Sequence, residues 1–280
     1  MRVLVTGANG QLGSELRRVA SADYLFTDIE ELDICSLKAV AEYVERNGID
    51  TIVNCAAYTN VDRAEEDRAA AERVNTAAVA ILAEVARSNN ARLIHISTDY
   101  VFGGEVFDAP IKESETPAPL GVYGETKYEG ERAIRESGCD YVIIRTSWLY
   151  SAYGNNFVKT IMRLASERDV LRVVNDQIGS PTYAKDLAEV IVQICGREKF
   201  ESGIYHYSNS GEISWCDFAR AIVDICGAEC RVEACTTVEY GAKAPRPAYS
   251  VLDTAKIRGA LGCEIPEWRE SLEKCINRML

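Results

Sequence analysis

The chain of 280 residues predicts an α/β fold, in which a doubly wound parallel sheet is followed by a smaller C-terminal α/β domain. Three observations support this. Short apolar runs alternate with helical patterns in the first half, a glycine-rich turn follows the first run, and 47% of the residues are hydrophobic. Parallel strands need crossover helices, so the alternation is typical of right-handed βαβ units. A chain of this length buries a core without disulfides or metals.

Each strand of the first half is expected from an apolar run that ends in turn residues, and each helix from apolar residues three or four positions apart. The first run ends at glycine, and the helix after it carries Leu12, Leu16 and Val19 on one side. Gly48 is a typical stop signal at a helix C-terminus. The expected strands are 2–6, 24–27, 51–57, 92–97 and 141–146, and the expected helices are 11–20, 37–47, 64–89 and 124–137.

The pattern is looser after residue 150. Ser214 with Asp217 is a typical N-cap pair for one of the later helices. Helices are expected at 155–168, 184–195, 214–226 and 267–280, and strands at 171–174 and 204–208. We therefore expect a first domain over 1–150, to which roughly 171–195 returns, and a second domain over 151–280. The second domain would pack over the carboxyl edge of the sheet, where such folds bind ligands.

Composition excludes several classes of function. Lys and Arg number 31 against 43 Asp and Glu, so the net charge is −12 and the chain lacks the basic field of a nucleic-acid-binding protein. No run approaches the roughly 18 apolar residues of a membrane span, and the N-terminus lacks the apolar core of a signal peptide. The 10 cysteines are scattered without a Cys-x-x-Cys pair, and only 2 histidines accompany them. We expect reduced thiols, no metal site and a cytoplasmic protein.

A glycine-rich turn joins the first expected strand to the first helix. Gly7, Gly10 and Gly13 have G-x-x-G-x-x-G spacing, with Gln11 and Leu12 between the last two. One glycine permits the tight turn, a second lets the backbone approach a pyrophosphate, and a third lets helix and strand pack closely. An ordinary strand–helix turn would explain three glycines alone. Their place after a buried strand favours a Rossmann-type dinucleotide site.

Asp28 ends the second expected strand, roughly 20 residues after Gly7, where a carboxylate accepts hydrogen bonds from the adenosine ribose. A simple turn residue is the alternative interpretation. The carboxylate would repel a 2′-phosphate, and Ile29, Glu30 and Glu31 offer no arginine to bind one. We therefore expect NADH as the favoured cofactor, with NADPH also usable.

Tyr123 and Lys127 form a Y-x-x-x-K pair on one face of a helix. A tyrosine with a pKa near 10 exchanges protons poorly at neutral pH, and a neighbouring ammonium is expected to lower that pKa. Tyr123 would then exchange a proton with a carbonyl or alkoxide. Alone, the pair is more often a surface contact. After a dinucleotide loop it predicts a catalytic pair.

Polar residues follow the fourth expected strand, at the sheet edge where ligands bind in such folds. There Thr98 would hydrogen-bond the reacting oxygen, and Asp99 would bind a second substrate hydroxyl. The alternative is an ordinary polar turn after a strand. His95 alternates with apolar neighbours, so we expect it to be buried with a structural role.

Together these motifs resemble the extended short-chain dehydrogenase/reductases that act on nucleotide sugars, and among them the dTDP-4-dehydrorhamnose reductases. The narrower resemblance covers nearly the whole chain. Its segments are GANGQLG (7–13), LDI (32–34), VNCAAYTNVDRAE (53–65), STDYVF (97–102), VYGETKYEGE (122–131), RTSWLY (145–150), GNNFVKTI (154–161), NDQIGSPT (175–182) and RPAYSVLDTAK (246–256).

The resemblance implies a role for each matching residue, with the second domain binding the substrate. The cofactor residues are Gly7, Gly10, Gln11, Leu12, Gly13, Asp28, Asp33, Ile34, Ala57, Tyr58, Thr59, Tyr123 and Lys127. The substrate residues are Thr98, Asp99, Tyr123, Trp148, Asn155, Asn156 and Arg246, and the catalytic residues are Thr98, Tyr123 and Lys127. Many members of the family carry histidine in place of Tyr58, so this departure bears on the cofactor contacts.

The implied reaction is hydride transfer from NAD(P)H to C4 of dTDP-4-dehydro-L-rhamnose, with Tyr123 as the proton donor. The product, dTDP-L-rhamnose, serves cell-wall polysaccharide synthesis. Some relatives are homodimers in which glutamates hold a bridging divalent cation such as Mg²⁺, and Glu15 would take that place here.

Three alternatives stay open. A nucleotide-sugar 4,6-dehydratase would carry glutamate where Tyr100 stands. A 4-epimerase would keep the same Tyr–Lys pair. The regulatory subunit of methionine adenosyltransferase resembles these reductases but acts as a binding partner, and such a role predicts loss of that pair.

Overall fold

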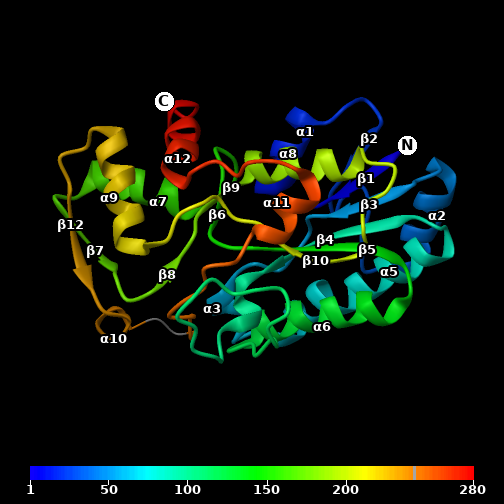
Figure 1. Ribbon diagram of the computed structural model, residues 1–280, viewed down its shortest axis with the longest axis horizontal. Helices are drawn as coiled ribbons and strands as arrows, with labels where there is room; N and C mark the ends of the chain where they lie inside the picture. Colours follow the sequence, from blue (N-terminus) through cyan, green and yellow to red (C-terminus); the bar gives the residue numbers. More distant parts are fainter. Residues whose placement is uncertain (242–243) are drawn as a thin grey trace.

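The structure is a computed structural model that describes residues 1–241 and 244–280. Its centre is a six-stranded parallel sheet with the order β10-β5-β4-β3-β1-β2 (Figure 1). The strands are β1 (Val3–Thr6), β2 (Tyr24–Thr27), β3 (Thr51–Asn54), β4 (Arg92–Thr98), β5 (Asp140–Thr146) and β10 (Gly203–His206). The doubly wound parallel sheet expected from the alternation of strands and helices is confirmed.

Helices cover both faces of this sheet, as Figure 1 shows. On one face lie α1 (Gln11–Val19), α8 (Ala184–Cys195) and α11 (Ala255–Leu261), which share a core with the inward side chains of the strands. On the other face lie α2 (Leu37–Asn47), α5 (Ala78–Ser88) and α6 (Val122–Ser137). Strands buried on both faces are uniformly apolar, which is why β1 has the continuous sequence VLVT.

A smaller α/β region lies beyond the carboxyl edge of the sheet (Figure 1). Its helices are α7 (Phe157–Glu167), α9 (Trp215–Cys226), α10 (Thr237–Tyr240) and α12 (Trp268–Asn277). Its strand pairs are β7 (Val170–Val174) with β12 (Arg231–Cys235), β6 (Leu149–Tyr150) with β9 (Thr182–Tyr183), and β8 (Ile178–Gly179) with β11 (Ile213–Ser214). Ser214 and Asp217 form the expected capping box of α9. The two-residue strands were not predicted, because they are too short to show a periodic pattern.

The segment 171–195 is divided between the two regions. Helix α8 packs against α1 on the large sheet, whereas β7 pairs with β12 in the smaller region. The chain then supplies β10 as the sixth strand, next to β5. The domain boundaries given above stay a prediction.

The single long helix expected over 64–89 is wrong. The chain forms α3 (Val61–Ala64), α4 (Arg68–Glu72), a π-helical turn (Arg73–Ala77) and then α5. A new helix begins at Asp67, because its carboxylate accepts a hydrogen bond from the Ala70 N–H at 3.1 Å. The π-helical turn forms where the Asn75 side chain binds both the N–H and the carbonyl of Tyr58, at 2.9 and 3.1 Å.

The 10 cysteines are all free, in agreement with the reduced thiols expected. Among residues 1–241 and 244–280, no helix has both the length and the apolar character needed to cross a membrane.

A buried ion pair attaches α6 to the sheet. Arg145 on β5 donates to both carboxylate oxygens of Glu131 on α6, at 2.9 and 2.6 Å. Ser97 on β4 donates to the same carboxylate at 2.5 Å. Neither charged side chain is more than 1% exposed, so each depends on the other for its solvation.

We expect Arg145→Met alone to lower the free energy of unfolding by about 3–5 kcal/mol, because Glu131 would remain as an unpaired buried charge. Combining it with Glu131→Leu removes both charges and should recover most of the loss. Urea denaturation of the three proteins measures this. The control is Arg163→Met, which breaks an exposed pair with Glu167 and should cost about 0–1 kcal/mol. Equal costs for the two single variants would contradict the prediction.

Candidate active site

A cavity of about 890 Å³ opens at the carboxyl edge of the large sheet. Its walls come from the segments that follow β1, β2, β3, β4 and β5, from the start of α6, and from the smaller region. The predicted site residues that line it are Gly7, Gly10, Gln11, Leu12, Asp28, Asp33, Ile34, Ala57, Thr59, Thr98, Asp99, Tyr123, Lys127, Trp148, Asn155 and Asn156. Gly13, Tyr58 and Arg246 are outside its lining.

Gly7 and Gly13 of the glycine loop leave no room for a side chain at their positions. Gly7 has a φ of +66°, and a Cβ there would lie 2.6 Å from the backbone nitrogen of Ala56. A Cβ on Gly13 would lie 2.4 Å from the Gly7 carbonyl oxygen, so Gly13 allows α1 to pack directly on the loop. Gly10 provides no side-chain cap for α1. The uncapped N-terminus of this helix therefore faces the cavity with the N–H groups that typically bind a phosphate.

Asp28 is held rigidly at the next position along the cavity. Its carboxylate accepts hydrogen bonds from the backbone N–H groups of Asn9, at 2.8 Å, and Ile29, at 2.9 Å. Arg73, on the π-helical turn, lines the same cavity and interacts electrostatically with Asp33. The sequence did not indicate Arg73, because only the fold brings this distant residue beside the end of β2.

Tyr58 points away from the cavity. Its backbone is bound by Asn75, and its ring packs in a small cluster with Ala64, Ala71 and Val122, beside Tyr123. Its hydroxyl is buried and has no hydrogen-bond partner within the described part of the chain.

Thr98, Asp99 and Tyr123 meet at the end of β4. The Thr98 hydroxyl donates to Asp99 at 3.0 Å and accepts from the Tyr100 N–H at 3.2 Å. The ring of Tyr100, which also lines the cavity, meets that of Tyr123 edge to face with centroids 5.4 Å apart. The Thr98 hydroxyl is also close enough to Tyr123 to lower the pKa of its phenol. The Thr98 hydroxyl, the Asp99 carboxyl and the Tyr123 phenol therefore lie close together at the cavity wall.

Electrostatics differ from the sequence-based expectation at Tyr123. Burial raises its pKa to about 12, the hydrogen bond with Thr98 lowers it, and the Asp99 carboxylate raises it. The pKa of Tyr123 is therefore set by its burial and not by the lowering expected from Lys127. The phenol holds its proton at neutral pH. Burial also raises the pKa of Asp99 to about 6, against the opposing hydrogen bonds of Ser250 and Thr98.

Lys127 is 2% exposed, and its ammonium nitrogen contacts β4. It lies 2.6 Å from the carbonyl oxygen of Ile96 and 3.1 Å from Nε2 of His95. Burial lowers the pKa of Lys127 to about 8, while the Glu131 carboxylate and Cys55 raise it. His95 is fully buried, as expected from the sequence, but the sequence did not indicate its contact with Lys127.

An aromatic wall closes the far side of the cavity. Trp148 has a φ of +47°, a strained conformation for a bulky residue, and its ring stacks on Trp215 with centroids 3.7 Å apart. A Cβ on Gly179 would lie 2.6 Å from the Trp148 ring, so this glycine leaves space for the indole. Trp215 was not predicted. It lies in the first turn of α9, far from the motifs that the sequence offered.

The two asparagines of the loop before α7 differ. Asn155 lines the cavity. The Asn156 side chain caps α7 at the Lys159 N–H and donates to Gln11 at 3.0 Å, so it joins the glycine loop to the smaller region.

Arg246 and Glu15 are each engaged elsewhere. Arg246 forms an ion pair with Asp62 at 2.9 Å. Glu15 is fully buried, and its two carboxylate oxygens accept hydrogen bonds from Ser151 and Arg278, both at 2.7 Å. No group of three or more His, Cys, Asp or Glu side chains within residues 1–241 and 244–280 is arranged to hold a metal ion.

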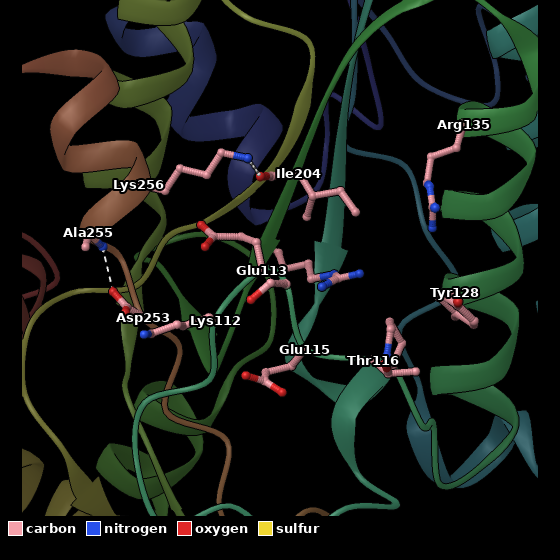
Figure 2. Close-up of a pocket in the computed structure, with 13 residues that line it drawn as sticks. Lys112, Glu113, Glu115, Thr116, Tyr128, Arg135, Ile204, Asp253, Ala255 and Lys256 are labelled. Carbon is pink, nitrogen blue, oxygen red and sulfur yellow. Dashed lines mark hydrogen bonds between the residues drawn. The ribbon is translucent and has the colours of Figure 1, made fainter.

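A second cavity, of about 860 Å³, contains none of the predicted site residues. Figure 2 shows acidic and basic side chains around it, several of them bound to the protein itself. Lys256 donates to the Ile204 carbonyl at 2.6 Å, Asp253 accepts from the Ala255 N–H at 2.8 Å, and Glu113 accepts from the N–H of His206 at 2.9 Å. The first cavity is therefore the candidate active site.

Known proteins resemble the chain over its full length. The family described as RmlD substrate binding domain matches residues 1–280. A dTDP-4-dehydrorhamnose reductase of Aggregatibacter actinomycetemcomitans is 42% identical, covering 97% of each chain. The spore coat polysaccharide biosynthesis protein SpsK of Bacillus subtilis is 43% identical, covering 99% of this chain and 97% of its own. A crystal structure of dTDP-4-dehydrorhamnose reductase from Bacillus anthracis in complex with NADP is 40% identical, covers 99% of each chain and has a TM-score of 0.94.

We expect Gly13→Ala to weaken dinucleotide binding by about 100-fold, or about 2.7 kcal/mol, because the new Cβ would force α1 away from the Gly7 carbonyl. Titration of NADH and NADPH fluorescence measures the loss. The control is Gly259→Ala, where a Cβ meets nothing within 4 Å. Unchanged dinucleotide affinity in a folded Gly13→Ala protein would contradict the prediction.

The raised pKa of Asp99 predicts a pH-dependent stability. The folded state holds this proton more tightly than the unfolded state, so the contribution is full below about pH 4 and is lost as pH rises through 6. Asp99→Asn stays neutral, so its stability relative to the native chain should rise by up to about 3 kcal/mol between pH 4 and 7. Urea denaturation across this range measures the difference, with the exposed Asp23→Asn as control. A difference that does not change with pH would contradict the prediction.

Proposed function

This chain belongs to the dTDP-4-dehydrorhamnose reductase family, and on that premise we propose that it reduces the C4 keto group of dTDP-4-dehydro-L-rhamnose to give dTDP-L-rhamnose. The observation that carries this function is the full-length match at 42% identity to a reductase of that name. It favours the reductase over a 4,6-dehydratase, a 4-epimerase or a regulatory subunit. The Tyr–Lys pair that a regulatory subunit would lose is present and lines the cavity.

The cavity fits a dinucleotide. The glycine loop is so closely packed that backbone N–H groups of α1, rather than side chains, face the space where a pyrophosphate would lie. Gly10, Gln11 and Leu12 would hold the pyrophosphate there, and Asp28 would accept hydrogen bonds from the adenosine ribose. Asp33 and Ile34 would flank the adenine, and Ala57 and Thr59 would line the cleft toward the reacting end. When bound, NAD(P)H supplies the hydride that reduces C4.

Tyr123 would donate the proton. Its raised pKa keeps the phenol protonated until the C4 oxygen gains charge as an alkoxide, which is a much stronger base than a ketone. Thr98 would donate a second hydrogen bond to the same oxygen, because its hydroxyl is close enough to the phenol to lower the pKa of Tyr123. The phenol proton is in place before the reaction, and only the Thr98 hydroxyl proton, which points at Asp99, would have to turn as charge develops.

Asp99 and Trp148 would orient the sugar. The Asp99 carboxylate, ionised above pH 6, would accept a hydrogen bond from a sugar hydroxyl beside C4. The Trp148 indole, braced by Trp215, would pack on the apolar face of the ring. Asn155 would bind the nucleotide diphosphate, whereas the ion pair of Arg246 with Asp62 would have to open before Arg246 could do so.

We propose NADH as the favoured cofactor, with NADPH also used. The Asp28 carboxylate lies where a 2′-phosphate would be repelled. Arg73 lines the same cavity and provides a cation that would offset this repulsion. The NADP bound in the Bacillus anthracis relative supports use of NADPH here as well.

A cytoplasmic homodimer is the assembly that we propose, from the free thiols and from the resemblance to dimeric relatives. A bridging Mg²⁺ on Glu15 does not fit, because this carboxylate is fully buried and is bound by Ser151 and Arg278.

We expect Tyr123→Phe to lower kcat by about 10²- to 10⁴-fold, because the alkoxide loses its proton donor. Oxidation of NADH and of NADPH at 340 nm, with dTDP-4-dehydro-L-rhamnose and other 4-keto nucleotide sugars, measures both the loss and the two preferences. Tyr128→Phe is the control, since Tyr128 lies on the same helix and lines the second cavity. Turnover of a different keto sugar alone would disprove the proposed substrate, and normal kcat in Tyr123→Phe would disprove the proposed donor.

A further inference from the structure

Behind Lys127, a row of buried polar side chains crosses the sheet. The Thr6 hydroxyl donates to Oδ1 of Asn54 at 2.7 Å, Nδ2 of Asn54 lies 3.0 Å from Nδ1 of His95, and Nε2 of His95 lies 3.1 Å from Nζ of Lys127. All four side chains are at most 2% exposed. Reduction of a ketone by Tyr123 does not by itself require this row.

The direction of each hydrogen bond follows from one backbone group. The N–H of Ala56 points at Oδ1 of Asn54 at 3.1 Å, and a backbone N–H can only donate. This identifies Oδ1 as the amide oxygen, so the amide nitrogen Nδ2 donates to Nδ1 of His95. Nδ1 is therefore an acceptor, and the single proton of the neutral imidazole is on Nε2, which faces Lys127.

A second contact determines whether Nζ of Lys127 presents a hydrogen or a lone pair to His95. The carbonyl oxygen of Ile96 lies 2.6 Å from Nζ and can only accept, so an N–H of Lys127 points there. An ammonium would also point a hydrogen at the Nε2–H of His95, and two donors at 3.1 Å repel each other. A neutral amine has a lone pair that accepts the Nε2–H.

On the basis of the reductase function proposed above, we infer that His95 is a positioning residue for Lys127: its Nε2–H donates to the lone pair of the neutral Lys127 amine and thereby favours release of a proton from this lysine. The lysine would then return the proton that Tyr123 has given to the substrate. In this step an N–H bond of the Lys127 ammonium breaks and the O–H bond of Tyr123 forms, so a +1/−1 pair becomes two neutral groups. Lys127 regains its proton from solvent when the cavity opens for product release.

The charged and titratable surroundings of Lys127 agree with this role. Glu131 on α6 favours the ammonium but is neutralised by Arg145, and Cys55 after β3 is a half-buried thiol whose pKa is raised by desolvation. Burial lowers the pKa of Lys127 to about 8, so loss and gain of its proton are both accessible near neutral pH. Burial and Lys127 together lower the pKa of His95 well below its usual value, so the imidazole stays neutral.

His206 has the opposite tautomer to His95 and serves as a comparison. Nδ1 of His206 lies 3.0 Å from the carbonyl oxygen of Ile111, so Nδ1 must carry the proton. Its Nε2 lies 3.5 Å from the Arg145 guanidinium, which can only donate. The chain has only 2 histidines, and the structure assigns them opposite tautomers.

Nitrogen-15 NMR of histidine-labelled protein tests the tautomer without any substrate. We expect the Nε2–H form for His95 and the Nδ1–H form for His206 at pH 7, with the signals assigned by loss of one in His95→Gln and of the other in His206→Gln. An Nδ1–H tautomer, or a protonated ring, at His95 would overturn the inference. This measurement remains informative even if the keto sugar is not the substrate, so it separates failure of the inference from failure of the proposed function.

His95→Gln tests the consequence for Lys127. A glutamine carbonyl at this place accepts from the ammonium, so the pKa of Lys127, followed by carbon-13 NMR of labelled lysine, should rise by one unit or more. The alkaline limb of the kcat profile, which is the fall in kcat at high pH, should move to higher pH by the same amount. We expect kcat at pH 7 to fall by about 10-fold or more. The KM for NADH should change little. His206→Gln should leave the lysine pKa and the alkaline limb in place. A role confined to packing predicts unfolding at lower urea with an unmoved limb, and that result would refute the inference.

Discussion

The carboxylate of Glu131 is the constraint on which the site depends. It is one turn beyond Lys127 on α6, and it binds a serine of β4 and the arginine of β5 where both charged side chains are buried. A charge in such a place is tolerated only when every oxygen is bound, so the position and rotation of α6 relative to the two strands are fixed within the tolerance of hydrogen bonds. Tyr123 and Lys127 lie on the same helix and are fixed with it.

Two glycines allow the close approach that this pair requires. A Cβ on Gly130 would lie 2.2 Å from the carbonyl oxygen of Asn75, and one on Gly124 would lie 2.5 Å from that of Tyr100. At these two glycines the backbone of α6 therefore lies directly against the π-helical turn and the 3₁₀ turn Asp99–Phe102. The second contact brings the start of the helix against the end of β4, where Thr98 meets the phenol of Tyr123.

The sequence was sufficient to predict what depends on local patterns. Helix α2 was predicted over 37–47, the range that the structure has, with Gly48 as its stop signal, and the glycine loop was predicted because backbone clearance requires glycine. Features that arise from long-range contacts were not predicted. Arg73 and Trp215 reach the cavity only after folding, and the π-helical turn within the segment 64–89 forms where Asn75 binds Tyr58. The pKa of Tyr123 was predicted in the wrong direction, since sequence spacing shows a neighbouring lysine but does not show burial.

The pairing of Glu15 with Arg278 has a consequence for how the molecule is made. The two residues are 263 positions apart, yet the carboxylate belongs to the helix that follows the glycine loop. At about 5–20 residues per second, a ribosome needs roughly 10 to 50 seconds to add the arginine after the glutamate. During that time α1 carries an acidic group that has no cation to meet when it packs against the sheet. We therefore expect α1 to reach its final packing late, together with α12, although it is among the first elements to emerge.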